Sequence, residues 1–478
     1  MSDPFVIVGG DAAGLSAASK FAREAPKQDV VVFEKGSWVS YAHCGMPYYV
    51  KGEVDSLEDL LTLTPAEVEQ RGINLRRHHE VTGIDTESNS VTVEAAGDQF
   101  EQPYDSFLIA TGGHAITAPI EGATLENAFT MHSMDSAAAL DASLTPPSDW
   151  DPAKTALEFV DADLVDRYAT TPRPETAAIV GGGYVGVEMA EALAGRDLDV
   201  HLFQRPDTLL PPFGRPVGEK IAATLENHGV TVHLETGVDE LRGDERVEAV
   251  ATDSEVLSVD LALVGIGIRP NTEFLAETPI ETVESGAIVT DEYGRTSVDS
   301  VYAAGDCAQM EHTVTGEPAW IPLGLTANRA GRAIGTTVAG TPTETGSVAG
   351  TAAVKAFDME AGRTGLIDHE AARSAGFDPV SETITTASRS GYYPGAADTT
   401  VTLTADRQSE QLLGGSIVGS DRAAVRIDTL ATALDQDMTV GELERLDLAY
   451  APPFSPVWDP ILVAAKVLNG RFDEDVSG

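Results

Sequence analysis

The segment FVIVGGDAAGLSAASKFAREAPKQDVVVFEK (residues 5–35) decides the fold class of this 478-residue chain. Apolar runs at both of its ends, with helical spacing in the small-residue segment between them, predict strand, turn, helix and strand. The same order returns in AAIVGGGYVGVEMAEALAGRDLDVHLFQR (residues 177–205). Two such units predict an α/β protein with two Rossmann-like domains, each built on a parallel sheet.

The first unit carries a glycine pattern typical of dinucleotide-binding turns, with one departure. Gly9 allows the tight turn, and Gly14 lets the helix pack closely on the strand, so that a pyrophosphate would lie at the helix N-terminus. Glu34 ends the second predicted strand, where a carboxylate accepts hydrogen bonds from a ribose. Asp11 stands where the pattern has its middle glycine. The turn alone is therefore weak evidence for a bound dinucleotide.

The second unit has the complete pattern, with Gly181, Gly183 and Gly186 directly after an apolar run. The acid expected at the end of its second strand is replaced by Gln204, and Arg205 follows. A carboxylate there binds the 2′-hydroxyl of NAD, whereas a nearby arginine accommodates the 2′-phosphate of NADP. We therefore expect NADPH in preference to NADH. A solvated surface arginine is the plain alternative, which leaves NADH open as the cofactor.

Composition limits the classes of partner. The formal net charge is −45, the acids are spread along the chain, and 42% of the residues are hydrophobic. This combination predicts a folded protein with an acidic, solvated surface, similar to proteins of extreme halophiles. Such a surface argues against nucleic acid as a partner. We find no apolar stretch near 20 residues and no export signal, so we expect a cytoplasmic protein that does not enter a membrane.

The two cysteines, Cys44 and Cys307, are 263 positions apart and do not suggest a disulfide framework. Cys44 lies in SYAHCGMPYYVKG (residues 40–52). A thiol attacks a disulfide only when ionised, and its pKa falls near positive charge or a helix N-terminus. His43 is adjacent, but neighbours in an extended segment point in opposite directions, so adjacency does not show that it activates Cys44. We interpret Cys307 as a small packed residue.

Two further segments carry a resemblance to flavoproteins. YDSFLIATGG (residues 104–113) and SVYAAGDCAQ (300–309) resemble the flavin-contacting segments of proteins that bind two dinucleotides, in which the aspartate, here Asp306, holds the ribityl chain of FAD. LALVGIGIRPNT (261–272) looks like the segment that leads the second domain back toward the flavin. Over nearly its whole length the chain resembles the pyridine nucleotide-disulfide oxidoreductases.

The cysteine segment narrows this resemblance to one branch. Many members carry a Cys-x4-Cys dithiol near the flavin, but the two candidate partner positions here are Val39 and Tyr49, so only Cys44 is available. This absence, together with SYAHCGMPYY, AFDMEAGRTGL, GYYPGA and YAPPFSPVWDP, makes the chain resemble the single-cysteine branch. That branch contains coenzyme A disulfide reductases, which the chain resembles most, and NADH oxidases.

The resemblance implies a reaction and a partner. Electrons would pass from NADPH or NADH through FAD to a mixed disulfide on Cys44, and the resulting thiolate would attack coenzyme A disulfide in a homodimer. An NAD(P)H oxidase or peroxidase with a Cys44 sulfenic acid stays open, as does reduction of a persulfide or another small disulfide. A flavin-binding interaction protein is a further alternative. No rhodanese-like segment follows in the sequence, which leads us to expect disulfide reduction rather than the chemistry of fused persulfide-handling members.

Residues on the first predicted helix are candidates for binding the substrate. Ser16, Lys20 and Arg23 fall on one helix face, and the resemblance implies that this face meets the substrate. Arg71 matches a basic substrate-binding position. The predicted substrate-binding residues are Ser16, Lys20, Arg23, Ser40, His43 and Arg71. Cations in so acidic a chain suit the phosphates of coenzyme A, and a solvated basic helix edge is the alternative.

Two tyrosines late in the chain are implied as catalytic residues together with Cys44. Tyr392 and Tyr450 match tyrosines that the family sends across a dimer interface into the partner's active site. A phenol can protonate a leaving thiolate. Tyr393 is interpreted as packing. Trp458 stands where a basic residue is expected in a coenzyme A disulfide reductase of this type, which weakens the case for coenzyme A but not for disulfide reduction.

The predicted domain order has four parts. Residues 1–115 and 291–345 form an FAD-binding domain, and 116–290 form an NAD(P)H-binding domain with an acidic, Pro-rich surface insertion at about 145–175 that carries no chemistry. Residues 346–478 form an α+β dimerisation domain with strands of alternating polarity. The predicted cofactor-binding residues are Gly9, Gly10, Asp11, Ala13, Gly14, Glu34, Lys35, Val81, Thr111, Gly112, Gly181, Gly183, Tyr184, Val185, Gly186, Glu188, Gln204, Arg205, Gly267, Gly305 and Asp306. No metal ligand is predicted.

Overall fold

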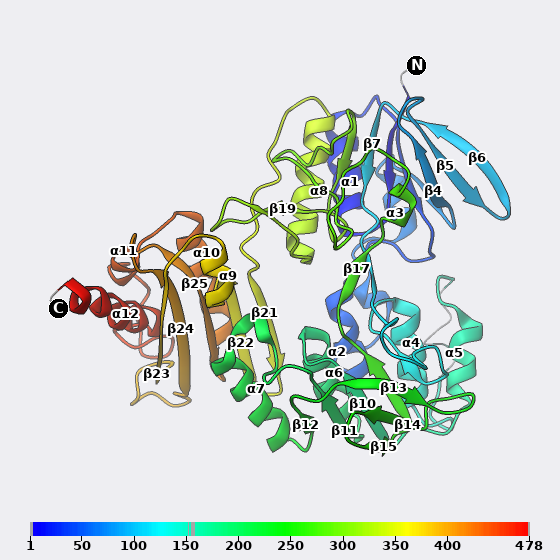
Figure 1. Cartoon of the computed structure of the whole chain (residues 1–478). Coiled ribbons are helices and arrows are strands. Elements are labelled where there is room, and N and C mark those ends of the chain that lie inside the picture. Colours follow the sequence, from blue (N-terminus) through cyan, green and yellow to red (C-terminus); the bar gives the residue numbers. More distant parts are fainter. Residues whose placement is uncertain (1–2, 152, 154–157, 477–478) are drawn as a thin grey trace.

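The computed structural model describes residues 3–151, 153 and 158–476, and it confirms the mixed α/β architecture (Figure 1). The first sheet is parallel, in the order β18, β7, β1, β2, β3. Its strands are β1 (Phe5–Val8), β2 (Val30–Glu34), β3 (Asn74–Arg77), β7 (Ser106–Ile109) and β18 (Val301–Ala303). All four residues of the central strand β1 are buried, as expected for a parallel strand covered on both faces.

Two helices that are far apart in the sequence pack against each other beside this sheet. α1 (Ala12–Glu24) connects β1 to β2, and α8 (Gly324–Val338) lies along it. A Cβ on Gly331 would lie 2.1 Å from the Ala13 carbonyl oxygen, so only glycine permits this approach. The packing brings α8 next to the first glycine turn. An antiparallel sheet of β4 (Glu80–Asp85), β5 (Ser90–Ala95) and β6 (Asp98–Pro103) completes this part.

The second parallel sheet repeats the plan, in the order β12, β11, β10, β16, β9. Its strands are β9 (Ala128–Phe129), β10 (Thr176–Val180), β11 (Asp199–Phe203), β12 (Thr231–His233) and β16 (Leu261–Val264). α6 (Tyr184–Ala194) connects β10 to β11, and α7 (Arg215–Asn227) precedes β12. A small antiparallel sheet follows, with β13 (Val238–Arg242), β14 (Ala249–Thr252) and β15 (Val256–Ser258). Each parallel sheet places its glycine turn at the C-terminal end of a central strand, where such folds bind ligands.

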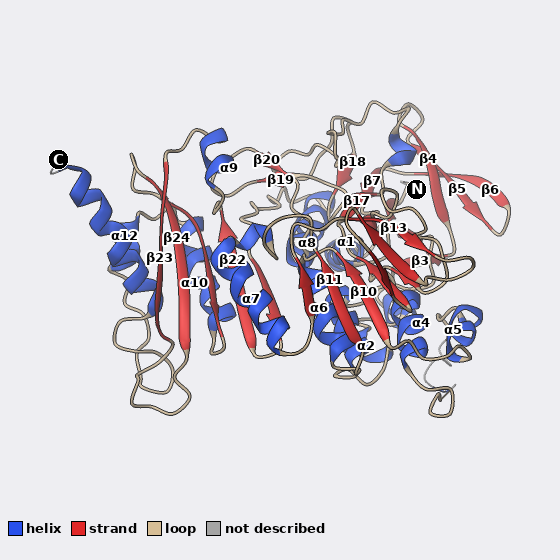
Figure 2. Ribbon diagram, turned by 60° about the horizontal axis from the view of Figure 1, so that its bottom comes forward, coloured by secondary structure: helices blue, strands red, loops and turns tan. Residues whose placement is uncertain are grey.

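The C-terminal part is an antiparallel sheet with helices, as the alternating pattern predicts (Figure 2). Its order is β21 (Ala352–Ala356), β22 (Met359–Gly365), β25 (Leu412–Gly419), β24 (Asp398–Asp406) and β23 (Pro379–Ala387). The helices are α9 (His369–Ser374), α10 (Ala423–Asp435), α11 (Val440–Glu444) and α12 (Pro460–Val476). Apolar residues of α10, α11 and α12 form one core with those of β24 and β25.

Two connections bear on the sequence-based expectations. β17 (Ile268–Pro270) pairs with β8 (Gly113–Ala115), so the segment 261–272 does lead from the second sheet back to the first domain. The predicted surface insertion at 145–175 is only partly a surface feature, because α5 (Ala162–Ala169) packs on α4 (Met134–Leu144) and buries Val165 and Tyr168. The amphipathic spacing of α5 explains this burial. Residues 152 and 154–157 of the insertion lie outside the described part.

Within the described residues, no helix combines the length and apolarity that crossing a bilayer requires. The exact domain boundaries near residues 115, 290 and 345 stay predictions.

Candidate active site

The first glycine turn has the geometry of a dinucleotide cradle. Gly9 has φ +106°, and a Cβ there would lie 2.0 Å from the Ala110 carbonyl oxygen. A Cβ on Gly14 would lie 2.0 Å from the Gly9 carbonyl oxygen. The Glu34 carboxylate accepts hydrogen bonds from the Gly10 N–H (2.8 Å) and the Gly36 N–H (2.7 Å), while burial raises its pKa. The close approach of backbone and the strand-end carboxylate fit an ADP-ribose unit, as in FAD.

Asp11, which replaces the middle glycine of this turn, ties the turn to the cysteine segment. Its carboxylate accepts a hydrogen bond from the Tyr41 N–H (3.1 Å) and lies 2.6 Å from His43 Nε2. The departure from the glycine pattern is therefore explained by a structural contact. His43, predicted to bind substrate, is held by this carboxylate.

The second glycine turn has the same geometry but a different strand-end residue. Gly181 has φ +110°, and a Cβ on Gly186 would lie 1.8 Å from the Gly181 carbonyl oxygen. Gln204 Oε1 accepts a hydrogen bond from the Gly182 N–H at 2.9 Å, which is the contact that Glu34 makes in the first turn. The Arg205 side chain is 65% exposed and lies 3.7 Å from Asp239.

The two predicted flavin-contacting segments meet at the ends of β7 and β18. Thr111 and Gly112 follow β7, and the Thr111 hydroxyl donates to the Asn271 carbonyl oxygen (2.7 Å). Gly305 and Asp306 follow the neighbouring strand β18. Burial raises the pKa of Asp306. Cys307 is fully buried, so its interpretation as a packed residue is confirmed.

The remaining predicted cofactor residues lie around the two turns. Lys35 lines a hollow of about 390 Å³ together with His78 and residues 94–99. Val81 is buried in β4, and Gly267 has φ +120° between β16 and β17. The other positions are Ala13 in the first turn of α1 and Tyr184, Val185 and Glu188 in the first turns of α6, with Gly183 as the N-cap of α6.

Cys44 is exposed and lies in a single turn of 3-10 helix, His43–Gly45, directly before α2 (Met46–Lys51). The expectation of an extended segment at this point is therefore wrong. The turn forms because the Gly45 N–H bonds the Ala42 carbonyl oxygen (2.9 Å), and a Cβ on Gly45 would lie 2.3 Å from a Leu60 methyl carbon. Cys44 therefore lies two residues before the first residue of α2, Met46.

The surroundings of Cys44 oppose ionisation of its thiol. Partial burial raises the pKa of Cys44, and the Glu188 and Asp306 carboxylates raise it further. Glu188 accepts a hydrogen bond from the Tyr48 hydroxyl (3.1 Å), and burial raises the Glu188 pKa to about 7. Two carboxyl groups near Cys44, those of Glu188 and Asp306, therefore have raised pKa values, and their charge depends on pH.

We expect Glu188→Gln to lower the pKa of Cys44, because the substitution removes a negative charge that opposes the thiolate. The measurement is the pH dependence of the rate at which iodoacetamide alkylates Cys44. Glu53→Gln serves as control, because Glu53 is exposed and pairs with Lys51 instead. A midpoint that is unchanged or higher in Glu188→Gln would show that this carboxylate does not influence the thiol.

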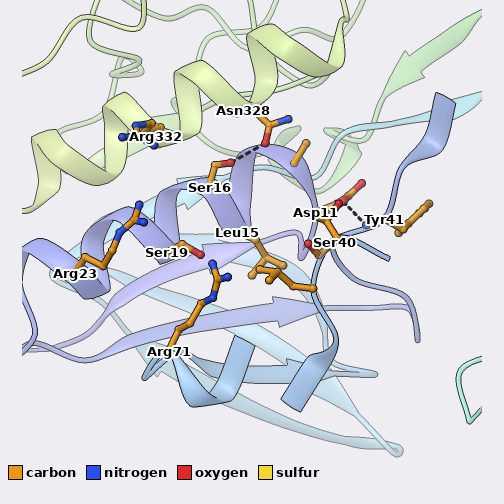
Figure 3. A pocket seen from close by; sticks show the side chains of 13 residues that line it. Asp11, Leu15, Ser16, Ser19, Arg23, Ser40, Tyr41, Arg71, Asn328 and Arg332 are labelled. Atoms are coloured by element: carbon orange, nitrogen blue, oxygen red, sulfur yellow. Dashed lines mark hydrogen bonds between the residues drawn. The ribbon is translucent and has the colours of Figure 1, made fainter. Parts of the chain in front are cut away.

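A pocket of about 290 Å³ collects most of the predicted substrate-binding residues (Figure 3). Its walls come from α1, the segment that precedes Cys44, the end of α3 (Pro65–Gln70) and α8. The residues that line it are Asp11, Ala12, Leu15, Ser16, Ser19, Arg23, Ser40, Tyr41, Thr62, Leu63, Arg71, Asn328 and Arg332. Lys20 and His43 are not among them: Lys20 pairs with Glu24, and His43 contacts Asp11.

Three guanidinium groups surround this pocket: Arg23 from α1, Arg71 from the end of α3, and Arg332 from α8. Within the described part of the chain, no carboxylate lies within ion-pair distance of any of the three. Arg332 and Asn328 were not predicted. Their i, i+4 spacing marks one helix face, but nothing local indicates that this face meets α1, where Asn328 Oδ1 accepts a hydrogen bond from Ser16 Oγ (2.8 Å).

The two predicted catalytic tyrosines lie together in the C-terminal part. Tyr392 is 77% exposed, Tyr450 is 49% exposed, and interaction with the Tyr392 hydroxyl raises the pKa of Tyr450. Trp458, which departs from the expected basic residue, is also exposed, and Lys466 Nζ lies 5.7 Å from the centre of its ring. A cation is thus present near this position although the residue itself is apolar.

Two dinucleotide-type sites, an exposed thiol between them and a C-terminal antiparallel domain define a flavin- and nucleotide-dependent oxidoreductase. The model of the pyridine nucleotide-disulphide oxidoreductase family matches residues 3–321, and that of its dimerisation domain matches residues 351–460. The chain belongs to this family.

Relatives and solved structures agree with this assignment. The chain is 38% identical to an NAD(P)H coenzyme A polysulfide/persulfide reductase of Pyrococcus horikoshii, over 98% of this chain and 99% of the relative. It is 28% identical to a coenzyme A disulfide reductase of Staphylococcus aureus, over 94% of this chain and 96% of the relative. The structure of a NAD-dependent persulfide reductase from A. fulgidus superposes with a TM-score of 0.89 at 32% identity, covering 98% of this chain and 84% of that one. The family is FAD-dependent and uses a pyridine nucleotide, so FAD and NAD(P)H are the cofactors.

Proposed function

We propose that the protein reduces coenzyme A disulfide to two coenzyme A thiols, with Cys44 as its redox-active residue. The observation that carries this proposal is a pocket lined by Arg23, Arg71 and Arg332 whose wall lies close in the chain to an exposed thiol. Ser40 and Tyr41 of the pocket wall precede Cys44 by only a few residues. Guanidinium groups bind phosphates through paired N–H donors, and coenzyme A carries three phosphates.

The steps at Cys44 follow from the chemistry of thiol-disulfide exchange. The thiolate attacks one sulfur of the substrate, the substrate S–S bond breaks, and one thiol leaves as a mixed disulfide forms on Cys44. The leaving sulfur takes a proton, for which Tyr392 and Tyr450 of a second copy are the proposed donors. Bound at the turn of Gly9 and Gly14, FAD would supply the two electrons from NAD(P)H that reduction of the mixed disulfide requires, and this reduction releases the second thiol. Cys44 then carries a thiolate again.

Thiol release tests this proposal against its alternatives. In molar salt we expect two thiols per NAD(P)H oxidised with coenzyme A disulfide. We also expect mass spectrometry of the unreduced protein to find a coenzyme A adduct on Cys44. Fast oxygen uptake without thiol release would instead indicate an oxidase that uses a Cys44 sulfenic acid, and would overturn the proposal.

Persulfide reduction is the second candidate, and the names of two similar proteins favour it. The P. horikoshii relative with this name is covered by the chain over 99% of its length. The same Cys44 and the same pocket would serve a coenzyme A persulfide. Comparing kcat/KM for coenzyme A persulfide and coenzyme A disulfide decides between them, and a ratio above about ten would name the preferred substrate.

We propose NADPH as the preferred nucleotide, because Arg205 follows the strand end where NAD-dependent enzymes carry an acid. Arg205→Ser is expected to raise the KM for NADPH about tenfold, the effect of losing one charge-assisted contact, and to leave the KM for NADH within about twofold. Arg215→Ser is the control, since Arg215 is an exposed arginine of the same part and pairs with Asp207. Equal weakening of both nucleotides would show that Arg205 does not read the 2′-phosphate.

The assembly and setting of the protein complete the proposal. The dimerisation domain supports a homodimer, and we propose that Tyr392 and Tyr450 reach the partner's thiol across its interface. The exposed apolar side chains Phe454, Val457 and Trp458 lie near Tyr450 in sequence and support an interface there. The net charge of −45 supports our proposal that the protein is adapted to high salt. We also propose a cytoplasmic location.

A further inference from the structure

A buried arginine in α10 binds the two loops that carry Tyr392 and Tyr450. Arg426 is buried, and all five of its N–H donors have an acceptor. Nε donates to Asp459 Oδ2 (3.1 Å). One terminal nitrogen donates to the carbonyl oxygens of Asp421 (3.2 Å) and Arg422 (3.3 Å), and the other donates to those of Ser388 (2.6 Å) and Phe454 (3.1 Å). One guanidinium thus joins three separate backbone segments.

The Ser388 contact fixes the base of the loop that carries Tyr392. The Ser388 N–H bonds the Ala397 carbonyl oxygen (2.8 Å), and the Ser388 hydroxyl donates to Asp421 Oδ2 (2.6 Å). Residues 389–396 therefore leave the sheet and return to it at a point that Arg426 holds. Tyr392 lies in this loop and is exposed.

The Phe454 and Asp459 contacts fix the loop that carries Tyr450. The Phe454 N–H bonds the Ala451 carbonyl oxygen (2.9 Å), which closes a turn directly after Tyr450. Ser455 Oγ donates to Asp459 Oδ2 (3.0 Å), the same oxygen that Arg426 Nε binds. The two loops are thus fixed at their bases by one side chain, and their tyrosine hydroxyls are near enough to interact, which raises the pKa of Tyr450.

We propose that Arg426 is the positioning residue for the Tyr392–Tyr450 pair, and that by holding both loop bases it keeps the two hydroxyls together as one proton-donating unit. This inference rests on the proposed function, in which the tyrosines protonate the leaving thiol. Because Arg426 is buried and the tyrosines are exposed, it acts through the loops and does not touch the substrate. A lysine offers three donors on one nitrogen, so it can satisfy at most three of the five acceptors.

Arg426→Lys is therefore the principal test, in the full-length holoenzyme in molar salt. We expect hydrogen exchange of backbone amides to become at least tenfold faster in both loops, 388–397 and 450–459. We expect kcat for the disulfide to fall at least tenfold, with its KM and the rate of flavin reduction by NADPH within twofold of the unaltered protein. The basic limb of the kcat–pH profile should shift to lower pH, because separated hydroxyls lose the interaction that raises the pKa of Tyr450.

Two further variants keep the test decisive. Asp459→Asn preserves shape and weakens one arm of the contact, so it is expected to loosen the Tyr450 loop more than the Tyr392 loop even if Arg426→Lys folds poorly. Arg373→Lys, an exposed arginine on α9, is the matched control and should change none of these quantities.

The outcomes separate the inference from the proposed function. Unchanged exchange in the loops of Arg426→Lys, or loosened loops with full turnover and an unshifted pH profile, would overturn the positioning role. Impaired Tyr392→Phe and Tyr450→Phe with an unimpaired Arg426→Lys would overturn the inference alone. Full turnover in both tyrosine variants would overturn the catalytic role of the pair in the proposed function, and with it the inference.

Discussion

Cys44→Ser is expected to reduce turnover of coenzyme A disulfide by about 10³-fold or more, because a serine hydroxyl neither ionises near neutral pH nor forms a mixed disulfide. Cys44 is not among the residues proposed to hold the nucleotide or the flavin. Reduction of the flavin by NADPH should therefore proceed at a rate within about twofold of that of the unaltered protein. The loss should appear only in the half-reaction that transfers electrons to the disulfide.

Stopped-flow absorbance of the flavin measures both half-reactions in one preparation. Cys307→Ala is the matched control, because Cys307 is fully buried and its Sγ lies 3.5 Å from the Ile109 carbonyl oxygen. We expect it to keep most of its turnover. Turnover of Cys44→Ser above about a tenth of that of the unaltered protein, or an equal loss in Cys307→Ala, would show that Cys44 is not the redox-active residue.

The sequence predicts best where function depends on local backbone geometry. Gly9, Gly14, Gly181 and Gly186 mark turns that depend on positions a few residues apart, and the structure gives both turns the same form. The strand patterns predict both sheet types for the same reason, since side-chain periodicity is a local property. The single-turn helix at Cys44 was missed because it depends on Leu60, which closes on Gly45 from elsewhere in the chain.

Contacts between distant segments explain what the sequence could not predict about the site. Arg332 and Asn328 reach the arginine-lined pocket only because Gly331 and Gly335 let α8 approach α1. Asp11 reads as a defect in the glycine pattern until its contacts with Tyr41 and His43 are known. In each case the decisive partner lies at least 30 positions away. A pattern that depends on neighbours in sequence carries no information about such partners.

The electrostatics of Cys44 also follow from distant segments, and they bear on the reaction. Glu188 comes from α6 of the second domain, Asp306 from the end of β18, and both oppose ionisation of the thiol. Free Cys44 is thus less reactive than a thiol beside a cation. FAD, NAD(P)H and coenzyme A disulfide carry phosphates, so their binding adds negative charge and does not by itself favour the thiolate.

The two glycine turns allow the roles of the two parallel sheets to be separated by matched substitutions. Gly14→Ala places a Cβ 2.0 Å from the Gly9 carbonyl oxygen, and Gly186→Ala places one 1.8 Å from that of Gly181. Backbone atoms cannot move aside as side chains do, so each helix must shift away from its strand. We estimate about 1.4–2.8 kcal/mol of lost binding, or about 10- to 100-fold in affinity.

The same clash in different sheets should give different phenotypes, because the two turns are proposed to hold different cofactors. Gly14→Ala is expected to purify with little FAD, seen as lost flavin absorbance. Gly186→Ala should keep its FAD, bind NADPH at least tenfold more weakly in flavin-reduction titrations and still be reduced by dithionite at the usual rate. Gly470→Ala, at an exposed position of α12 where a Cβ meets nothing within 4 Å, should match the unaltered protein. If Gly186→Ala lost FAD while Gly14→Ala kept it, the proposed assignment of FAD to the first domain and NADPH to the second would be reversed. Loss of both cofactors in both variants would mean that each turn is needed for the whole fold. A clash confined to one parallel sheet cannot otherwise prevent cofactor binding at the other sheet.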